Sequence, residues 1–142
     1  MTSKIFYPFD IQHIDYERYS YTVDFARQTN SEVTFFTVLP ENSSEQENNI
    51  PHLYLSRHYG YYQSFHNRWQ RMDDFKKKRV FKEGALRLEL KKILQTEQYD
   101  LLIPNSSECE QIINEFYTKA HIISHSLTTQ LFNFIIKDSI IK

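Results

Sequence analysis

The chain has 142 residues, 40% of them hydrophobic and 25% charged, which is typical of a single soluble globular domain. The formal net charge of −1 gives no overall field that would attract nucleic acid or an anionic membrane, and no apolar run reaches the roughly 20 residues that span a bilayer. Gly60 and Gly84 are the only glycines, which excludes a Walker loop and a G-x-G-x-x-G turn, and the single Cys109 excludes an intrachain disulfide.

The amino-terminal segment and the lone cysteine both favour a cytoplasmic location. Met1 is followed almost at once by an expected strand at Lys4, which leaves no room for a signal peptide. A chain with one cysteine also suits a reducing compartment. We therefore expect a cytoplasmic protein that binds neither a membrane nor nucleic acid.

The first expected element is a buried strand over Lys4–Asp10, KIFYPFD, which we place at the centre of a parallel sheet. Asp10 then lies at the carboxyl end of this strand, where ligands collect in open α/β sheets. A turn at Ile11–His13 leads into a helix from about Asp15 to Thr29. The expected buried face of this helix consists of Tyr16, Tyr19, Val23 and Ala26, while Glu17, Arg18 and Arg27 lie off that face.

The next strand, Val33–Leu39, is nearly continuous in β-branched and aromatic residues, which indicates burial on both faces. Together with the preceding strand and helix it forms a right-handed βαβ unit. The residues at about 40–52 are polar and acidic, and we expect a surface loop there. A second helix is predicted within Leu53–Lys78, starting after Gly60 if that glycine interrupts it. Its stripe consists of Tyr61 or Tyr62, Phe65, Trp69 and Met72.

The second half of the chain repeats the alternation of strands and helices. The expected strands are Arg79–Lys82, Tyr99–Pro104 and a short edge strand at Ser139–Ile141. The expected helices are Ala85–Glu97, one that begins at a Ser107-x-x-Glu110 capping box and buries Ile112 to Ala120, and Ser126–Ile136. This alternation predicts one α/β domain over residues 1–142, with a doubly wound parallel sheet and helices on both faces.

The order of these segments resembles the universal stress protein family. KIFYPFD, an amphipathic helix and VTFFTVLP resemble its opening, Lys82-Glu83-Gly84 before a helix and then YDLLI resemble its middle, and Ser126–Lys142 resembles its closing helix and strand. The resemblance implies a Rossmann-like, five-stranded parallel sheet of order 3-2-1-4-5. It also implies adenine nucleotides, in the members that bind them, at the crevice between strands 1 and 4.

The resemblance places candidate nucleotide-binding residues at four positions of this sequence. Asp10 matches the acidic position that contacts adenine, and Val38 matches the apolar position near the base. In the phosphate motif G-x2-G-x9-G-S/T, Ser107 falls on the second glycine and Ser126 on the final Ser/Thr. Pro104 and His125 fall on the first and third glycines.

This phosphate motif is degenerate in the present chain. All three glycines are absent, and 18 residues separate Ser107 from Ser126 where the motif has ten. Glycine lets backbone N–H groups close on phosphate oxygens without a Cβ in the way, and proline removes a donor. The capping box would also fill a helix N-terminus with Ser107, Glu108 and Glu110, whose charge repels a triphosphate. We therefore expect no cofactor and no standard ATP binding.

Other constellations of reactive residues are weaker. His121 and His125 would share a helix face as metal ligands do, but the Glu of H-E-x-x-H and a third ligand are missing, so we predict no metal site. Ser126, His125 and Asp10 could compose a catalytic triad, yet there is no G-x-S-x-G elbow, and we predict no enzyme.

Two segments have the composition of interaction surfaces. Lys76–Arg79 follows Arg68, Arg71 and Trp69, which is the mixture of a nucleic-acid surface, although a solvated helix end explains it better. The aromatic stripe between Tyr54 and Trp69 is too rich for a small core, so part of it could form an exposed interface. The edge strand at Ser139–Ile141 would be unpaired in a monomer and paired in a homodimer. The resemblance implies such a homodimer, because family members commonly dimerise through this strand.

Three hypotheses follow for function. The first is a non-enzymatic, homodimeric binding or interaction module in a stress response, without standard ATP binding, in which Asp10, Val38 and Ser126 line a small pocket. The alternative is an adenine-nucleotide binder whose phosphate site is rebuilt in residues 104–126. The third is an enzyme of another nucleotide-binding α/β family, for which the sequence offers no catalytic set.

Overall fold

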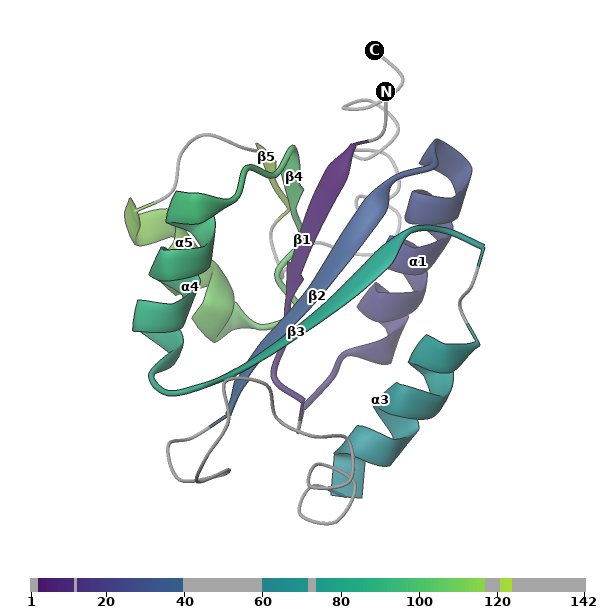
Figure 1. Ribbon diagram of the computed structural model, residues 1–142, viewed down its shortest axis with the longest axis horizontal. Coiled ribbons are helices and arrows are strands. Elements are labelled where there is room, and N and C mark those ends of the chain that lie inside the picture. The colour runs from purple at the N-terminus through teal and green to yellow at the C-terminus, as the bar shows by residue number, and fades with distance from the viewer. Residues whose placement is uncertain (1–2, 12, 40–59, 72–73, 117–120, 124–142) are drawn as a thin grey trace.

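The computed structural model describes residues 3–11, 13–39, 60–71, 74–116 and 121–123. These residues form a parallel sheet in the order β3-β2-β1-β4-β5, with helices α1 and α3 on one face and α4 and α5 on the other (Figure 1). The strands are β1 (Lys4–Pro8), β2 (Glu32–Leu39), β3 (Lys77–Glu83), β4 (Leu101–Leu102) and β5 (His121–Ile122). The predicted doubly wound α/β fold and the order 3-2-1-4 of its first four strands are therefore confirmed, and the described strand beside β4 is His121–Ile122, which was not predicted as a strand.

The central position of β1 is also confirmed. β1 pairs in parallel with β2, from Lys4 opposite Glu32 to Pro8 opposite Phe36, and with β4, where Ile5 lies opposite Leu101. The four residues of β1 that follow Lys4 are all buried. The chain leaves the sheet at Phe9, whose N–H still donates to the Phe36 carbonyl at 2.9 Å, and Asp10 follows at the carboxyl edge.

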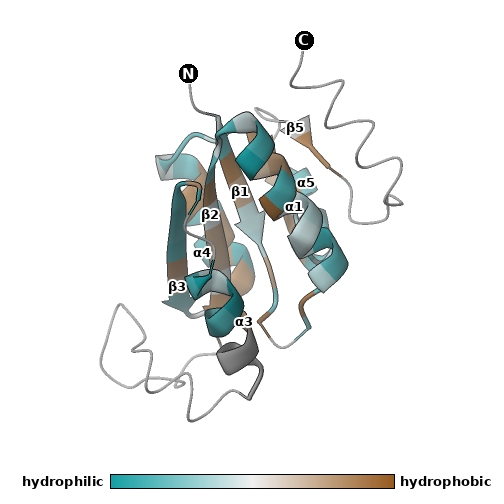
Figure 2. Cartoon of the chain, turned by 90° about the vertical axis from the view of Figure 1, so that its right-hand side faces the viewer, coloured by the Kyte–Doolittle hydropathy of each residue, from teal (hydrophilic) through white to brown (hydrophobic). Residues whose placement is uncertain are grey.

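The two faces of the sheet carry two separate apolar clusters. On the first face, alternate residues of β1 and β2 pack with α1 (Tyr16–Thr29) and α3 (Gly60–Gln70) in a cluster rich in aromatic rings. On the second face, Phe6 and Phe36 pack with α4 (Leu86–Thr96) and α5 (Ser107–Phe116). The alternation follows from the two-residue period of a strand. Figure 2 shows the apolar stretches of β1 and β2 between the more hydrophilic α1 and β3.

Helix α1 buries more of its surface than its sequence suggested. Asp15 caps its N-terminus, accepting hydrogen bonds from the N–H groups of Glu17 and Arg18, and Asn30 ends it in a left-handed conformation. Tyr19, Val23 and Ala26 are buried as expected, whereas Tyr16 is only partly buried. The prediction that Arg18 lies off the buried face was wrong, because Arg18 is only 5% exposed. The helix packs on the sheet on one side and beneath the exits of β4 and β5 on the other.

The helix predicted within Leu53–Lys78 ends earlier in the structure, and residues 53–59 lie outside the described part of the chain. The described helix, α3, spans Gly60–Gln70, and Lys77 and Lys78 belong to β3. Seven register pairs join β2 to β3, from Val33 opposite Lys77 to Leu39 opposite Glu83. This pairing overrides the helical propensity of the lysines. The basic run is thus part of an edge strand, where lysines discourage pairing with another chain.

The exposed aromatic patch expected between Tyr54 and Trp69 can be tested only at Phe65 and Trp69. Phe65 is fully buried in the first cluster, and Trp69 is partly buried under Lys77 and Arg79, whose charged groups each lie 4.3 Å from its ring centroid. His66 is also buried and contacts an Arg79 nitrogen at 2.9 Å. These side chains form a packed edge of the fold.

Helix α5 begins where the sequence predicted, but its cap is one residue earlier. The Ser106 hydroxyl accepts the Cys109 N–H at 3.1 Å, and the Ser106 carbonyl accepts the Glu110 N–H at 3.1 Å. The prediction of Ser107 as the cap was therefore wrong. The described part of the helix runs to Phe116, and His121 lies in strand β5. The predicted helix face at His121 is therefore absent, and His125 lies outside the described residues.

Several predictions fall outside the described residues. They are the polar loop at about 40–52, the helix at Ser126–Ile136 and the edge strand at Ser139–Ile141. Within the part of the chain that is described, no helix has both the length and the apolar character needed to cross a membrane.

Candidate functional site

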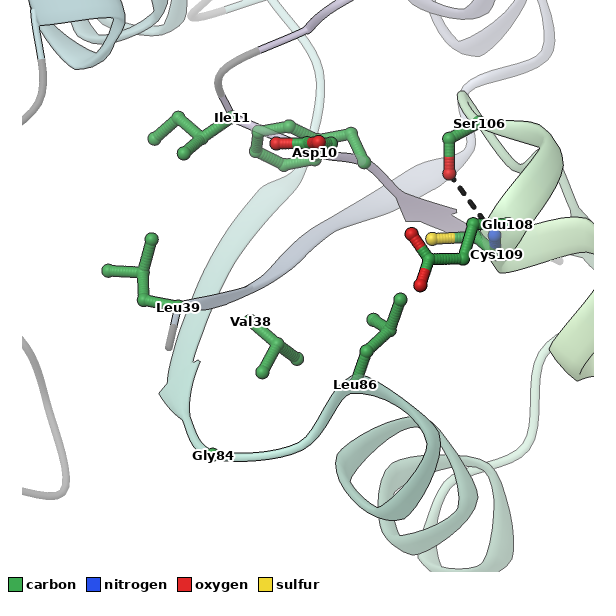
Figure 3. A pocket seen from close by; sticks show the side chains of 10 residues that line it. Asp10, Ile11, Val38, Leu39, Gly84, Leu86, Ser106, Glu108 and Cys109 are labelled. Atoms are coloured by element: carbon green, nitrogen blue, oxygen red, sulfur yellow. Dashed lines mark hydrogen bonds between the residues drawn. The ribbon is translucent and has the colours of Figure 1, made fainter. Parts of the chain in front are cut away.

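A cavity of about 380 Å³ lies at the carboxyl edge of the sheet, where β1, β2 and β3 end and α4 and α5 begin. Residues at or next to the ends of these five elements converge on it (Figure 3). Its lining is Phe9, Asp10, Ile11, Val38, Leu39, Gly84, Leu86, Ser106, Glu108 and Cys109. A cavity of this size is within the range of small-molecule sites, and we call it the crevice.

The crevice brings together two of the four candidate residues. Asp10 follows β1 and Val38 lies near the end of β2, and both line the crevice. Ser107 is exposed and does not line it, whereas its neighbour Ser106 does. Ser126 lies outside the described residues. Asp10 and Val38 therefore share one cavity that Ser107 does not line, and the prediction for Ser126 stays untested.

The ionisable groups that line the crevice are acidic. Asp10 lies at its rim with 49% of its side chain exposed, and its carboxylate lies 3.1 Å from Nδ1 of His13. Glu108 faces the crevice from the first turn of α5 (Figure 3). No lysine or arginine is among the described residues of the lining. The carboxylates of Asp10 and Glu108 themselves repel a bound polyanion.

Cys109 lies at the inner wall of the crevice and is 2% exposed. Burial raises the pKa of its thiol to about 11, with Glu108 and Asp10 adding to the effect and Ser106 opposing it. The thiol therefore stays protonated at neutral pH. A protonated buried thiol is a weak nucleophile and contributes mainly to packing.

The backbone donors around Pro104 are already used inside the protein. Ile103 N–H donates to the Phe6 carbonyl and Asn105 N–H donates to the Pro8 carbonyl, each at 2.9 Å. Pro104 between them has no N–H. At the start of α5, the Cys109 N–H is taken by the Ser106 hydroxyl. The N–H groups of Ile103, Asn105 and Cys109 are therefore not available to a phosphate oxygen.

A buried polar network lies behind this segment and connects it to α1. Arg18 Nε donates to the Pro104 carbonyl at 2.8 Å, and Arg18 Nη2 donates to the Ile123 carbonyl at 2.5 Å. Burial lowers the pKa of Arg18, while Tyr7, Glu110 and Asp15 act in the opposite direction.

Asn105 supplies the other half of the network. Its Oδ1 accepts the Asp15 N–H at 2.8 Å, and its Nδ2 donates to the Asp15 carbonyl and to the Tyr7 hydroxyl. Burial also raises the pKa of Tyr7 well above its usual value. These hydrogen bonds fix the exit of β4 against the beginning of α1.

Comparison with solved structures identifies the fold. A universal stress protein UspA from Lactobacillus plantarum superimposes with a TM-score of 0.59 and 14% identity, over 85% of this chain and 95% of that one. A universal stress protein family member from Burkholderia pseudomallei has a TM-score of 0.56 and 10% identity, over 85% of this chain and 95% of that one. A universal stress protein in complex with cAMP has a TM-score of 0.56 and 10% identity, over 87% of this chain and 96% of that one.

The chain has the universal stress protein fold. No protein-family model and no curated protein matches its sequence. At identities of this size the structural match establishes the architecture alone, and it leaves the ligand and the role of this chain to be argued from its own residues. The crevice occupies the sheet edge at which α/β folds of this kind place ligands.

In this universal stress protein fold, the described residues offer little for a metal. No group of three or more His, Cys, Asp and Glu side chains in the described ranges is arranged to hold an ion. A small organic ligand could instead pack on Val38, Leu39 and Leu86 and hydrogen-bond to Asp10. The crevice therefore suits a ligand with an apolar body and a few polar groups.

Sequence reasoning missed three residues that shape this region. Arg18 was assigned to solvent because a single helical stripe was drawn through Tyr19 and Val23. The buried and polar Thr22, one turn from Arg18, marks the second buried stripe. Ser106 was missed because the capping-box pattern fits Ser107 with Glu110, whereas Ser106 has Cys109 three residues later. Leu86 was assigned to the core, where it lies in part, although it also lines the crevice.

Proposed function

We propose that this chain is a non-enzymatic binding module that acts in a stress response and accepts a small, largely apolar ligand in the crevice. A nucleobase or nucleoside fits this description, and a triphosphate does not. The observation that carries the proposal is the lining itself: an apolar floor with Asp10 and Glu108 at the edge and no basic side chain among the described lining residues.

The backbone geometry supports the same conclusion. Phosphate sites at the carboxyl edge of α/β sheets combine open N–H groups, a helix N-terminus and often a cation. Here the N–H groups of Ile103, Asn105 and Cys109 have acceptors within the protein. Glu108 places a negative charge in the first turn of α5, so the positive end of the helix dipole already interacts with a carboxylate of the protein.

Adenine-nucleotide binding is the second candidate. Two observations favour it: Asp10 and Val38 meet in one cavity, and one of the solved universal stress proteins with this fold is described as a complex with cAMP. Its phosphate groups would require a site rebuilt within residues 104–126, part of which lies outside the described residues.

We further propose that the module carries out no turnover. Cys109 is the strongest potential nucleophile in the crevice, and its raised pKa of about 11 keeps it as a thiol. The Ser106 hydroxyl is engaged as the cap of α5. An assay for phosphate or AMP released from ATP tests this point, and measurable release abolished by Cys109→Ala or Ser106→Ala would contradict it.

We also propose a cytoplasmic homodimer that pairs through the carboxyl-terminal strand at Ser139–Ile141. The support is the resemblance to the family and the general tendency of unpaired edge strands to associate. Light scattering after size exclusion should give twice the mass of one chain. A variant ending before Ser139 should give the monomer mass, and a dimer that persists in this variant would contradict the proposed interface.

A thermal-shift series tests the binding proposal. Adenosine, AMP and ATP with Mg²⁺ are compared at equal concentrations, since saturation at 100 times Kd adds about 2.7 kcal/mol of stability. We expect a rise in melting temperature with adenosine that is reduced in Asp10→Asn. Asp24→Asn removes an exposed carboxylate of α1 that does not line the crevice, and it is the matched control. A rise with ATP alone would favour the second candidate, and no rise with any ligand would contradict both.

A further inference from the structure

The ladder between β4 and β5 stops at a proline. Leu101 lies opposite His121 and Leu102 opposite Ile122, and the Ile123 N–H donates to the Leu102 carbonyl at 2.9 Å. In a parallel ladder the next hydrogen bond runs from the N–H of residue 104 to the Ile123 carbonyl. Residue 104 is proline and has no N–H, so this bond cannot form.

Pro104 therefore leaves a buried carbonyl to be satisfied by another donor. Ile123 is 1% exposed and Pro104 is buried as well, so water has little access to their backbone. The Pro104 carbonyl, on the same side of β4, also requires a donor beyond the end of the ladder. A buried carbonyl without a hydrogen bond destabilises a fold, and such groups are almost always paired.

Arg18 supplies both hydrogen bonds. Its Nη2 donates to the Ile123 carbonyl at 2.5 Å, and its Nε donates to the Pro104 carbonyl at 2.8 Å. The planar guanidinium presents several N–H donors at fixed angles, so one side chain can bridge two strand ends. Its position in the first turn of α1 is fixed by Asp15, which accepts the Arg18 N–H at 3.2 Å.

We propose that Arg18 is a positioning residue of the crevice, which replaces the ladder bond that Pro104 removes and so fixes the exit of β4. The chain runs directly from Pro104 into Ser106, Glu108 and Cys109, which form the wall of the crevice on the side of α5. The peptide between Pro104 and Asn105 is held at both ends, its carbonyl by Arg18 and its N–H by the Pro8 carbonyl. It cannot turn its N–H toward a ligand without breaking both bonds.

The specificity that follows rests on the proposed function: with this peptide held, the crevice lacks a donor that a phosphate would need. The positioning role itself requires no ligand. The two statements can therefore be tested separately, the first by the binding of adenosine and ATP and the second by the variants below.

A double-mutant cycle tests the positioning role. Arg18→Met removes the donors and keeps most of the side-chain volume, and Pro104→Ala restores the N–H that the ladder lacks. We expect Arg18→Met to lower the melting temperature of the full chain strongly. Because the restored N–H satisfies the Ile123 carbonyl, we expect at least about half of this loss to disappear in the Pro104→Ala background. Arg18→Lys should give an intermediate loss, since one ammonium group cannot donate to both the Pro104 and the Ile123 carbonyl in the geometry of the guanidinium.

The alkylation rate of Cys109 reports the position of the crevice wall. It is the only cysteine of the chain and is buried in the crevice, so its reaction with a maleimide requires the start of α5 to open. Well below melting, we expect Arg18→Met to raise this rate at least about tenfold and Pro104→Ala to bring the double variant back toward wild type.

Val23→Ala is the matched control. Val23 is buried on the same helix but faces the groove between α1 and α3 that Arg68 and Arg71 also line. We expect it to lower the melting temperature without raising the Cys109 rate when the variants are compared at equal distance below melting. Strictly additive losses in the cycle, or equal Cys109 rates in Arg18→Met and Val23→Ala, would overturn the proposal.

Discussion

The carboxyl edge of this sheet has two halves that end in opposite ways. The crevice lies beyond the ends of β1 and β2 and is lined by Asp10, Val38 and the starts of α4 and α5. Beyond β4 and β5 the backbone is tied to α1 by Arg18 and Asn105. Both halves of the edge belong to the same parallel sheet, so the difference between them comes from a few side chains. The two halves of this edge therefore differ within one fold: one forms a cavity, and in the other internal hydrogen bonds hold the backbone.

The largest effect should come from the closed half, at Asn105. Asn105→Ala removes the partners of the Asp15 N–H and carbonyl and of the Tyr7 hydroxyl in a site where Asn105 is 1% exposed. We expect a loss of about 2 to 4 kcal/mol in the free energy of unfolding, measured by urea denaturation. Asn114→Ala, at an exposed position of α5, is the control and should change stability by less than about 0.5 kcal/mol. Equal losses in the two variants would contradict a specific network at Asn105.

The thiol in the open half should make the protein sensitive to alkali. Burial raises the pKa of Cys109 from 9.0 to about 11, so between these values the folded state holds a proton that the unfolded chain has released. The stabilisation is complete below about pH 9 and is lost as the pH rises toward 11, by about 2 to 3 kcal/mol. Urea denaturation at pH 8 and pH 10.5 should show a smaller loss in Cys109→Ala than in wild type. Equal losses would show that the thiol is not protonated by burial.

Gly84 should be the next most sensitive position of the open half. Its φ of +141° is a conformation that side-chain-bearing residues rarely adopt, and its N–H donates to the Leu39 carbonyl at 2.9 Å. A Cβ there would meet only Glu89 at 3.7 Å, so backbone strain and not crowding should set the effect. We expect Gly84→Ala to cost about 1 to 3 kcal/mol by urea denaturation. A neutral substitution would mean that the turn relaxes without strain.

The smallest effect should occur where the two halves meet, at the cap of α5. Ser106→Ala removes the acceptor of the Cys109 N–H and should cost about 1 kcal/mol. Ser107→Ala, one residue later, is the control and should change the urea midpoint much less. The reverse order would show that Ser107 is the cap, as the sequence alone suggested.

Sequence patterns predicted the parts of this molecule that depend on one element at a time. The apolar run from Ile5 to Phe9 marked the central strand, and the ends of the first two strands placed Asp10 and Val38 at one edge. Asp15 as a helix start and Leu90 and Leu94 as a buried stripe required only local periodicity.

The remaining features depend on contacts between distant segments. Arg18 is buried because Pro104, 86 residues away, leaves carbonyls without a donor. Lys77 and Lys78 are in a strand because β2 offers a partner. The matching of the glycine motif placed the phosphate end of the site at Ser126, which lies outside the described residues, so this prediction stays untested. The strand β5 at His121–Ile122 was not predicted, because it exists only through its pairing with the distant β4.

Isothermal titration of wild-type protein with adenosine and with ATP and Mg²⁺ in one buffer tests the central claim most directly. The open half of the edge should bind the nucleoside, and the closed half should add nothing for the phosphates, so adenosine should bind at least as tightly as ATP. ATP binding tenfold or more tighter than adenosine, which corresponds to about 1.4 kcal/mol from the phosphates, would contradict the account, and so would the absence of heat from both ligands.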